Sequence, residues 1–344
     1  MSLDSVESQR GRVNMRAVAD RAGVAMSSVS RVLSDHPDVS KAMRQRVLAA
    51  VEELGYTPDL LAQSLRRQET KTIGFAIGDI SNQLFAEIVA AAETRFREAG
   101  YSLLLTNSEG HPDLDAANIL LLAQRRVDGL ILSVSNERDP AMLRALGRLD
   151  VPVVLLDRNV DVGRSLHVYT DHQPGMRNAV NHLLDLGHRR IALISGQPLR
   201  PVNERRAALE GCWAARGLDK TYQLLEGTLS VEYGSLATSQ LLSQPDPPSA
   251  IIAGGNQLML GALRVLHARR IKLGDQMSFV GCDDIPVSEF YEPPIAVVRR
   301  DNSAIGRTAA DLMIEAMQDP DYRADMVLPT EFVARPSCGP APGA

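Results

Sequence analysis

The sequence predicts an all-α helix-turn-helix head followed by an α/β body of two lobes, each built on a doubly wound parallel sheet. Two observations carry this prediction. Within residues 13–33, apolar residues recur at helical spacing on both sides of a turn at Gly23. After residue 71, short apolar segments alternate with amphipathic segments of helical length, in two blocks that meet near Asp171. Such alternation is typical of parallel sheets covered by helices.

The head is expected to hold three helices around one small core. Asn14 is the predicted N-cap of the first helix, and the second helix covers about residues 26–34. Ser40 is the predicted cap of a third helix over residues 41–54, and Gly55 ends that helix as a glycine after the last turn. The residues assigned to the shared core are Val18, Val24, Val29, Val32, Val47 and Leu54.

The body is expected to alternate strands and helices from residue 72 onwards. The predicted strands cover residues 72–79, 101–107, 127–134, 151–157, 190–196, 249–255, 277–284 and 328–333. The predicted helices cover residues 85–100, 113–126, 140–149, 203–217, 257–270 and 303–317.

The domain boundaries follow from these changes in pattern. The expected divisions are a mobile N-terminus (1–11), the head (12–57), a hinge helix and linker (58–70), the body (71–337) and a disordered tail (338–344). Within the body, the N-lobe is expected to cover about 71–168 plus 300–325, and the C-lobe about 172–298 plus 326–337.

Charge and composition narrow the functional classes. The whole chain has a net charge of −5, but residues 1–71 hold eleven Lys or Arg against nine Asp or Glu. A weakly basic head on an acidic body favours local phosphate contact without general attraction to polyanions. The three cysteines are far apart, so neither a metal site nor a cofactor is expected. No signal peptide or apolar run of 18 residues is visible, which favours a cytoplasmic protein with no membrane contact.

The second predicted helix carries the residues expected to contact DNA. The N-terminal residues of such a helix enter the major groove. Met26 offers apolar contact to a thymine methyl group, and Ser27 offers a hydrogen bond to a base edge. Arg31 is expected either to bind a guanine through two bonds or to hold a phosphate. The further DNA candidates of the head are Ser28, Ser30 and Ser40.

The head MRAVADRAGVAMSSVSRVL and the motifs ELGYTPD, DLGHRRIALISG and VGCDDI, in this order, resemble the LacI-type (LacI/GalR) family of bacterial transcriptional regulators over residues 13–337. The resemblance implies a body with the periplasmic-binding-protein fold and a homodimeric repressor that binds a near-palindromic DNA operator. It also implies a small-molecule effector, a sugar or a similar sugar acid, between the lobes. The protein would then be cytoplasmic and associated with the nucleoid. No heptad repeat follows residue 337, so we expect a dimer rather than a tetramer.

The resemblance also assigns a DNA role to the hinge helix. In the family, two such helices, one from each subunit, enter the minor groove at the centre of the operator. Leu65 matches the leucine that wedges into the central base step, which kinks the duplex. The further hinge candidates are Ala62, Gln63 and Arg66.

Loops at the carboxyl ends of the predicted strands supply the expected effector contacts, as in other open α/β sheets. These candidates are Asp79, Asn82, Phe85, Ser133, Asn136, Asp157, Arg158, Asn256 and Asp283. The resemblance adds an effector arginine three residues before a helix glycine, but that position before Gly211 holds Ala208. Arg206 is taken as the candidate, while Arg205 and the lack of any such arginine stay open.

Two other functions are weighed. A solute-binding protein would carry an export signal and no head, and neither expectation fits this sequence. A sugar-processing enzyme would need a catalytic set, but the sequence shows no G-x-S-x-G, GxxxxGK[ST] or H-E-x-x-H motif. Asp283 and Asp284 could form a paired-carboxylate site. Their place at a strand end favours a role in anchoring a ligand, so no enzymatic activity is expected.

Overall fold

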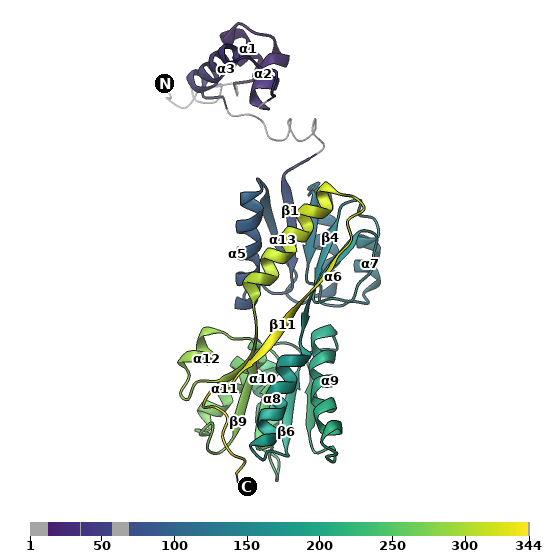
Figure 1. Ribbon diagram of the computed structural model, residues 1–344, viewed down its shortest axis with the longest axis vertical. Helices are drawn as coiled ribbons and strands as arrows, with labels where there is room; N and C mark the ends of the chain where they lie inside the picture. The colour runs from purple at the N-terminus through teal and green to yellow at the C-terminus, as the bar shows by residue number, and fades with distance from the viewer. Residues whose placement is uncertain (1–12, 35, 57–68, 343–344) are drawn as a thin grey trace, which may run out of the picture. The chain divides into compact units, whose positions relative to one another are not determined.

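The computed structural model describes residues 13–34, 36–56 and 69–342 of the chain. The contacts within the chain divide it into two compact units, one ending at Thr70 and one beginning at Lys71 (Figure 1). The predicted hinge residues Ala62, Gln63, Leu65 and Arg66 lie outside the described residues.

The head consists of three helices, α1 (Met15–Ala22), α2 (Met26–Leu33) and α3 (Lys41–Leu54). The predicted caps are confirmed, because Asn14 accepts a hydrogen bond from the Ala17 amide and Ser40 accepts one from the Met43 amide. Gly23 and Gly55 end their helices with positive φ angles of 63° and 59°, a conformation that costs glycine least. Of the predicted core, Val18, Val29, Val32 and Val47 are buried, while Val24 and Leu54 pack half-buried against them.

The N-lobe of the body is built on five parallel strands in the order β2-β1-β3-β4-β5. These strands are β1 (Thr72–Ile77), β2 (Ser102–Asn107), β3 (Gly129–Leu132), β4 (Val153–Leu156) and β5 (Ser165–Asp171). The helices α5 (Gln83–Glu98) and α13 (Asn302–Gln318) cover one face and lie side by side, and α6 (Pro112–Gln124) and α7 (Pro140–Leu146) cover the other (Figure 1).

The C-lobe repeats this order, as β10-β9-β8-β6-β7. Its strands are β6 (Ile191–Ser195), β7 (Gln223–Glu226), β8 (Ala250–Ala253), β9 (Ser278–Cys282) and β10 (Ala296–Arg300). The helices α8 (Gln173–Asp185) and α9 (Arg200–Ala215) pack on one face, and α10 (Val231–Leu242) and α11 (Asn256–Ala268) pack on the other. The short α12 (Pro286–Phe290) precedes β10. Trp213, the one tryptophan of the sequence, is buried on α9 with its ring edge-on to Tyr222.

One strand joins the two half-sheets. The first part of β11 (Asp325–Val333) runs parallel to β5 in the N-lobe, and its last four residues pair antiparallel with β10 in the C-lobe. Figure 1 shows this yellow strand passing from one lobe to the other. The two predicted sheets are therefore parts of one mixed sheet, and the sequence did not predict this link.

Six of the described regular elements were not predicted from the sequence, namely β5, β7, β10, α8, α10 and the short α12. β5 (SLHVYTD) mixes polar and apolar residues, and β7 is a short edge strand that is half-exposed. α10 contains Gly234 and several Ser and Thr residues, which are weak helix formers. Each of these segments is stabilised by tertiary packing rather than by local preference.

The predicted disorder of the tail is wrong for residues 338–342. The Gly339 amide donates to Ser278 Oγ at 3.0 Å, and the Ala341 amide donates to the Leu186 carbonyl at 2.8 Å. Buried His188 contacts the Gly339 carbonyl at 3.0 Å. These contacts use backbone groups of the tail, so its Gly- and Pro-rich composition did not reveal them.

Within the part of the chain that is described, no helix combines the length and apolar character needed to span a bilayer.

Candidate effector cleft and DNA-contact helix

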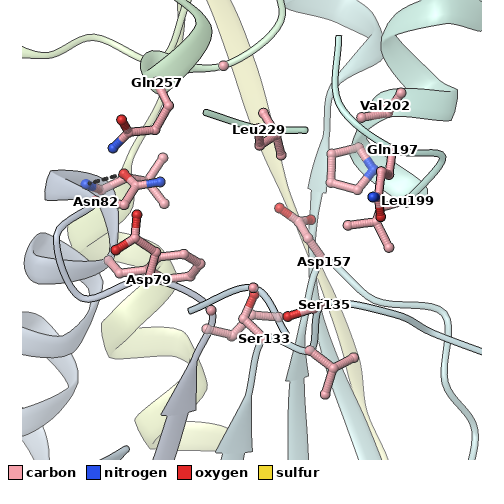
Figure 2. Close-up of a pocket in the computed structure, with 18 of the residues that line it drawn as sticks. Asp79, Asn82, Ser133, Ser135, Asp157, Gln197, Leu199, Val202, Leu229 and Gln257 are labelled. Atoms are coloured by element: carbon pink, nitrogen blue, oxygen red, sulfur yellow. Dashed lines mark hydrogen bonds between the residues drawn. The ribbon is translucent and has the colours of Figure 1, made fainter. Parts of the chain in front are cut away.

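A cavity of about 750 Å³ lies between the two lobes of the body, at the carboxyl ends of their strands (Figure 2). Both lobes contribute to its wall. Nine of the ten predicted effector residues line it, namely Asp79, Asn82, Phe85, Ser133, Asn136, Asp157, Arg158, Asn256 and Asp283. The tenth, Arg206, does not. Strand order explains this convergence, because parallel strands bring loops from distant parts of the chain to one edge.

Two asparagines connect the lobes across this cavity. Asn82 is the N-cap of α5, and its Oδ1 accepts from the Leu84 amide. The same oxygen accepts from Nδ2 of Asn256, the first residue of α11, at 2.7 Å; Figure 2 shows this bond as a dashed line. The bond closes the cleft at this point, so a ligand that alters it also alters the contact between the lobes.

Asp157 is the centre of a buried charge cluster in the wall of the cavity. It is buried, has a positive φ of 52°, and follows β4. Its carboxylate accepts from the Thr170 amide at 2.5 Å, from Arg300 Nη1 at 2.9 Å and from Arg200 Nη1 at 3.3 Å. Burial by itself raises the pKa of Asp157, but its hydrogen bond to His172 and the nearby positive charges outweigh this and lower the pKa below the usual value.

His172 extends this cluster into the C-lobe. Its Nε2 lies 3.4 Å from Asp157 Oδ2, and its Nδ1 lies 3.3 Å from Arg205 Nη2. A guanidinium only donates, so Nδ1 is the acceptor and the ring proton lies on Nε2, facing Asp157. Burial, followed by the charge of Arg205, lowers the pKa of His172 to about 4. The ring is therefore neutral at pH 7 and links Asp157 to Arg205.

The placement of the arginines on α9 corrects the choice of Arg206. Arg206 points away from the cavity and bonds Glu226 and Asn203. Arg205 lines the cavity, is 6% exposed, and donates to the Gly254 carbonyl at 2.7 Å. It lies three residues before Ala208, on the same face of the helix. Counting along the sequence could not separate these adjacent arginines, because neighbours on a helix point about 100° apart.

Three further wall residues, Arg158, Asp79 and Asn136, are held by hydrogen bonds to backbone groups. Arg158 Nε donates to the Val134 carbonyl at 2.5 Å, and its Nη1 donates to the Asp157 carbonyl at 3.0 Å. Burial lowers the pKa of Arg158. Asp79 accepts from the Ser81 amide, and Asn136 accepts from the Arg138 amide. These bonds hold the three side chains in place. The side-chain oxygens of Asp79 and Asn136 keep further lone pairs for ligand hydroxyls.

The paired-carboxylate alternative does not match the geometry. Asp283 accepts from Arg300 Nε at 3.1 Å, whereas Asp284 accepts from Arg335 Nη2 at 2.8 Å. The two carboxylates therefore serve different arginines, and only Asp283 lines the cavity.

The sequence analysis missed several wall residues. Arg300 follows the apolar residues of β10, a strand that was not predicted, although the rule of strand ends would have found it. Leu229 lines the cavity and is 47% exposed, next to Gly255. The remaining missed polar residues on the wall are Glu109, His111, Ser135, Gln197, Thr228, Ser230 and Gln257.

In the head, α2 separates a buried face from an exposed one. Val29 and Val32 are buried in the core of the head. Met26, at the start of the helix, is 50% exposed. The other predicted contacts are Ser27 and Arg31, which are exposed, Ser28 and Ser30, which are half-buried, and Ser40, which is exposed and caps α3.

Family models of known proteins match both the head and the body. Residues 14–59 match the model of bacterial regulatory proteins of the lacI family, and residues 70–335 match the model of periplasmic binding proteins and the sugar-binding domain of the LacI family. The ribose operon repressor of Escherichia coli (strain K12) is 33% identical over 311 residues, which cover 89% of this chain and 93% of that protein.

Two solved structures of LacI-type regulators are also similar to this chain. A lac repressor dimer bound to operator and the anti-inducer ONPF has a TM-score of 0.84 and 29% identity, covering 96% of this chain and 100% of that one. A LacI-family regulator from Enterococcus faecium with bound ribose has a TM-score of 0.71 and 26% identity, covering 78% and 99%. The chain belongs to the LacI family and is a transcriptional repressor, not an enzyme, with a helix-turn-helix DNA-binding domain and an effector-binding body.

Proposed function

We propose that this repressor binds a near-palindromic operator as a homodimer and that a small hydroxylated effector in the cleft changes its affinity for DNA. The observation that carries the proposal is the cavity lined by both lobes. Its volume of about 750 Å³ falls within the usual range for small-molecule sites. A ligand that touches both walls favours one arrangement of the lobes and thereby biases a two-state equilibrium. The related regulator from Enterococcus faecium holds ribose, which supports a carbohydrate-like effector.

The homodimer is supported by apolar side chains on the surface of the body. β2 is an edge strand of the sheet, and Ile80, Leu104 and Leu121 are exposed around it. In the C-lobe, Phe290 is 83% exposed. Exposed apolar groups on a sheet edge favour association with a second chain. The similar lac repressor was solved as a dimer on its operator.

The DNA contacts proposed for the head are those of the exposed side of α2. Met26 and Ser27 stand at the end of the helix that enters a major groove, and Arg31 reads a guanine or holds a phosphate. Ser28, Ser30 and Ser40 contribute phosphate bonds. In the hinge, Leu65 wedges a base step beside Ala62, while Gln63 and Arg66 contact the backbone. A repressor that binds chromosomal DNA works in the cytoplasm, on the nucleoid.

The proposal is tested by a gel shift with the purified full chain on palindromes from the upstream region of its own gene. We expect a shifted band of dimer stoichiometry, whose intensity changes when a sugar or sugar acid is added. The control is a scrambled duplex of the same length. No shift at low salt, with or without the candidate effectors, would overturn the proposal.

A further inference from the structure

We propose that the effector carries an anionic group, a carboxylate or a phosphate, and that this group binds beside Arg205. The inference rests on the proposed function only in assuming that the cleft holds the effector. The structural basis is one incompletely satisfied, buried cation that lines the cavity next to the N-terminus of α11.

Arg205 keeps donor capacity that the protein does not use. Its Nη1 donates to the Gly254 carbonyl and its Nη2 to His172 Nδ1, both of them neutral groups. Its Nε is buried and has no hydrogen-bond partner. No ion pair involves Arg205 within the described part of the chain, although the side chain is 6% exposed. A buried charge without a carboxylate partner is costly, so an anion from solution is strongly favoured there.

The start of α11 adds positive potential at the same place. The carbonyl that Arg205 contacts belongs to Gly254, and the N-cap of α11 is Gly255, which has no side chain to bond the first amides. One of these amides, that of Gln257, donates to Asn256 Oδ1 at 2.9 Å. Gly254, Gly255 and Asn256 all line the cavity. The N-terminus of this 13-residue helix presents amide groups and the positive end of its dipole, which favour a bound anion.

The carboxylates of the cavity do not cancel this potential. Asp157 is bound by Arg200 and Arg300, and Asp283 is bound by Arg300. The two other wall carboxylates, Asp79 and Glu109, come from the N-lobe. Glu109 is exposed to solvent, and Asp79 is labelled in Figure 2 beside Asn82. We assign Asp79 and Asn82 to hydroxyl groups of the effector and Arg205 to its acid group. The geometry therefore favours a hydroxylated acid over a neutral sugar.

The experiment measures thermal stabilisation of the full chain by inorganic phosphate at constant ionic strength, with sodium chloride replaced stepwise. We expect a saturable rise in melting temperature. Arg205→Met should weaken the apparent affinity by at least about tenfold, the value of one lost charge-assisted contact. Arg206→Met is the matched control, because that adjacent arginine faces Glu226 outside the cavity, and it should bind phosphate like the unmodified protein.

A second pair of variants keeps the test decisive where Arg205→Met itself unfolds the protein. Leu229 is 47% exposed and lies against Gly255, so polar substitutions there leave the core intact. Leu229→Glu places a carboxylate near the start of α11 and should weaken phosphate binding by about fivefold relative to Leu229→Gln at low salt. Equal binding by the two Leu229 variants, or by the two arginine variants, overturns the proposal, as does the lack of any stabilisation by phosphate.

Two matched pairs of probes identify the acid. Ribose is compared with ribose 5-phosphate, and glucose with gluconate. Preference for one acid over its neutral partner, lost in Arg205→Met, supports the inference and tells phosphate from carboxylate. Tighter binding of both neutral sugars overturns it. Operator binding measured without any probe tests the repressor function separately, so the failure of one claim is distinguishable from the failure of the other.

Discussion

Asp157 connects the buried charged and polar side chains at the junction of the two lobes, because Arg200, Arg300 and His172 all reach its carboxylate. All four side chains are largely buried. The removal of one partner leaves the others charged and desolvated, which costs more than the pair itself contributes. The cluster therefore specifies how the two lobes meet more than it adds net stability.

The substitution Asp157→Asn should lower the free energy of unfolding by about 3 kcal/mol, the lower end for a broken buried pair, because Arg300 keeps Asp283 and Arg200 keeps Glu204 as a partner. Urea denaturation at pH 7 measures this. The control is Asp325→Asn, which removes a half-exposed negative charge beside His167 and should cost about 1 kcal/mol or less. A loss below about 1 kcal/mol for Asp157→Asn would show that the cluster relaxes freely.

His172 makes stability depend on pH. Its pKa falls from 6.5 to about 4 on folding, so between these values the unfolded chain binds more protons. Stability is therefore full above pH 6.5 and declines as the pH falls toward 4. His172→Gln should start from a lower melting temperature and show a shallower decline over this range. His188, whose burial also lowers its pKa, retains part of the slope. An unchanged slope in His172→Gln would contradict the assignment.

On the DNA side, Arg31→Ala should cost about 1–3 kcal/mol of binding free energy, and the loss should depend on one base position of each half-site. Fluorescence anisotropy with operators substituted at each position measures this. Arg190→Ala, which removes a surface charge of the C-lobe, serves as the control. A uniform loss across all operators would assign Arg31 to a phosphate.

At the scale of elements, substitutions at the neighbouring hinge residues Leu65 and Arg66 should affect DNA binding in different ways. Leu65→Ala should reduce binding to the operator and leave binding to unrelated DNA unchanged, because the wedge is removed and the cations stay. Arg66→Ala should weaken binding to both DNAs and lower the salt dependence by about one phosphate contact. If Leu65→Ala weakens both equally, Leu65 is not a wedge.

The sequence pattern alone predicted the elements in which apolar residues recur with a clear period. The caps at Asn14 and Ser40, and the third helix of the head from Lys41 to Leu54, were all predicted from the residues alone. The loops at the strand ends predicted nine wall residues of the cavity. The same rule missed Arg300 because β10 is short and was not recognised as a strand.

Other features depend on long-range structure and left no local signal. The pairing of β11 with both β5 and β10 joins segments that are far apart in the sequence. The choice between Arg205 and Arg206 depends on the rotation of α9 against the sheet, which burial of Ala208 fixes. The docking of the tail uses backbone amides, which every residue but proline carries.

At the scale of the whole molecule, association should depend on the edge of the N-lobe. We expect a dimer at micromolar concentration in sedimentation velocity. The double variant Ile80→Glu with Leu104→Glu places charge on the exposed edge and should shift the protein toward monomer. Leu236→Glu, at another exposed position on α10, is the matched control. A monomer in the unmodified protein would contradict the dimer.

Trp213 gives the molecule a single optical reporter in a useful place. It lies on α9, the helix that carries Arg205 at the cavity, and it is buried within the C-lobe core. Because the sequence holds no other tryptophan, emission excited at long wavelength comes from this one indole. A shift of α9 on ligand entry would therefore be recorded from one lobe alone, so stopped-flow fluorescence could time the event at the cleft before any change at the DNA.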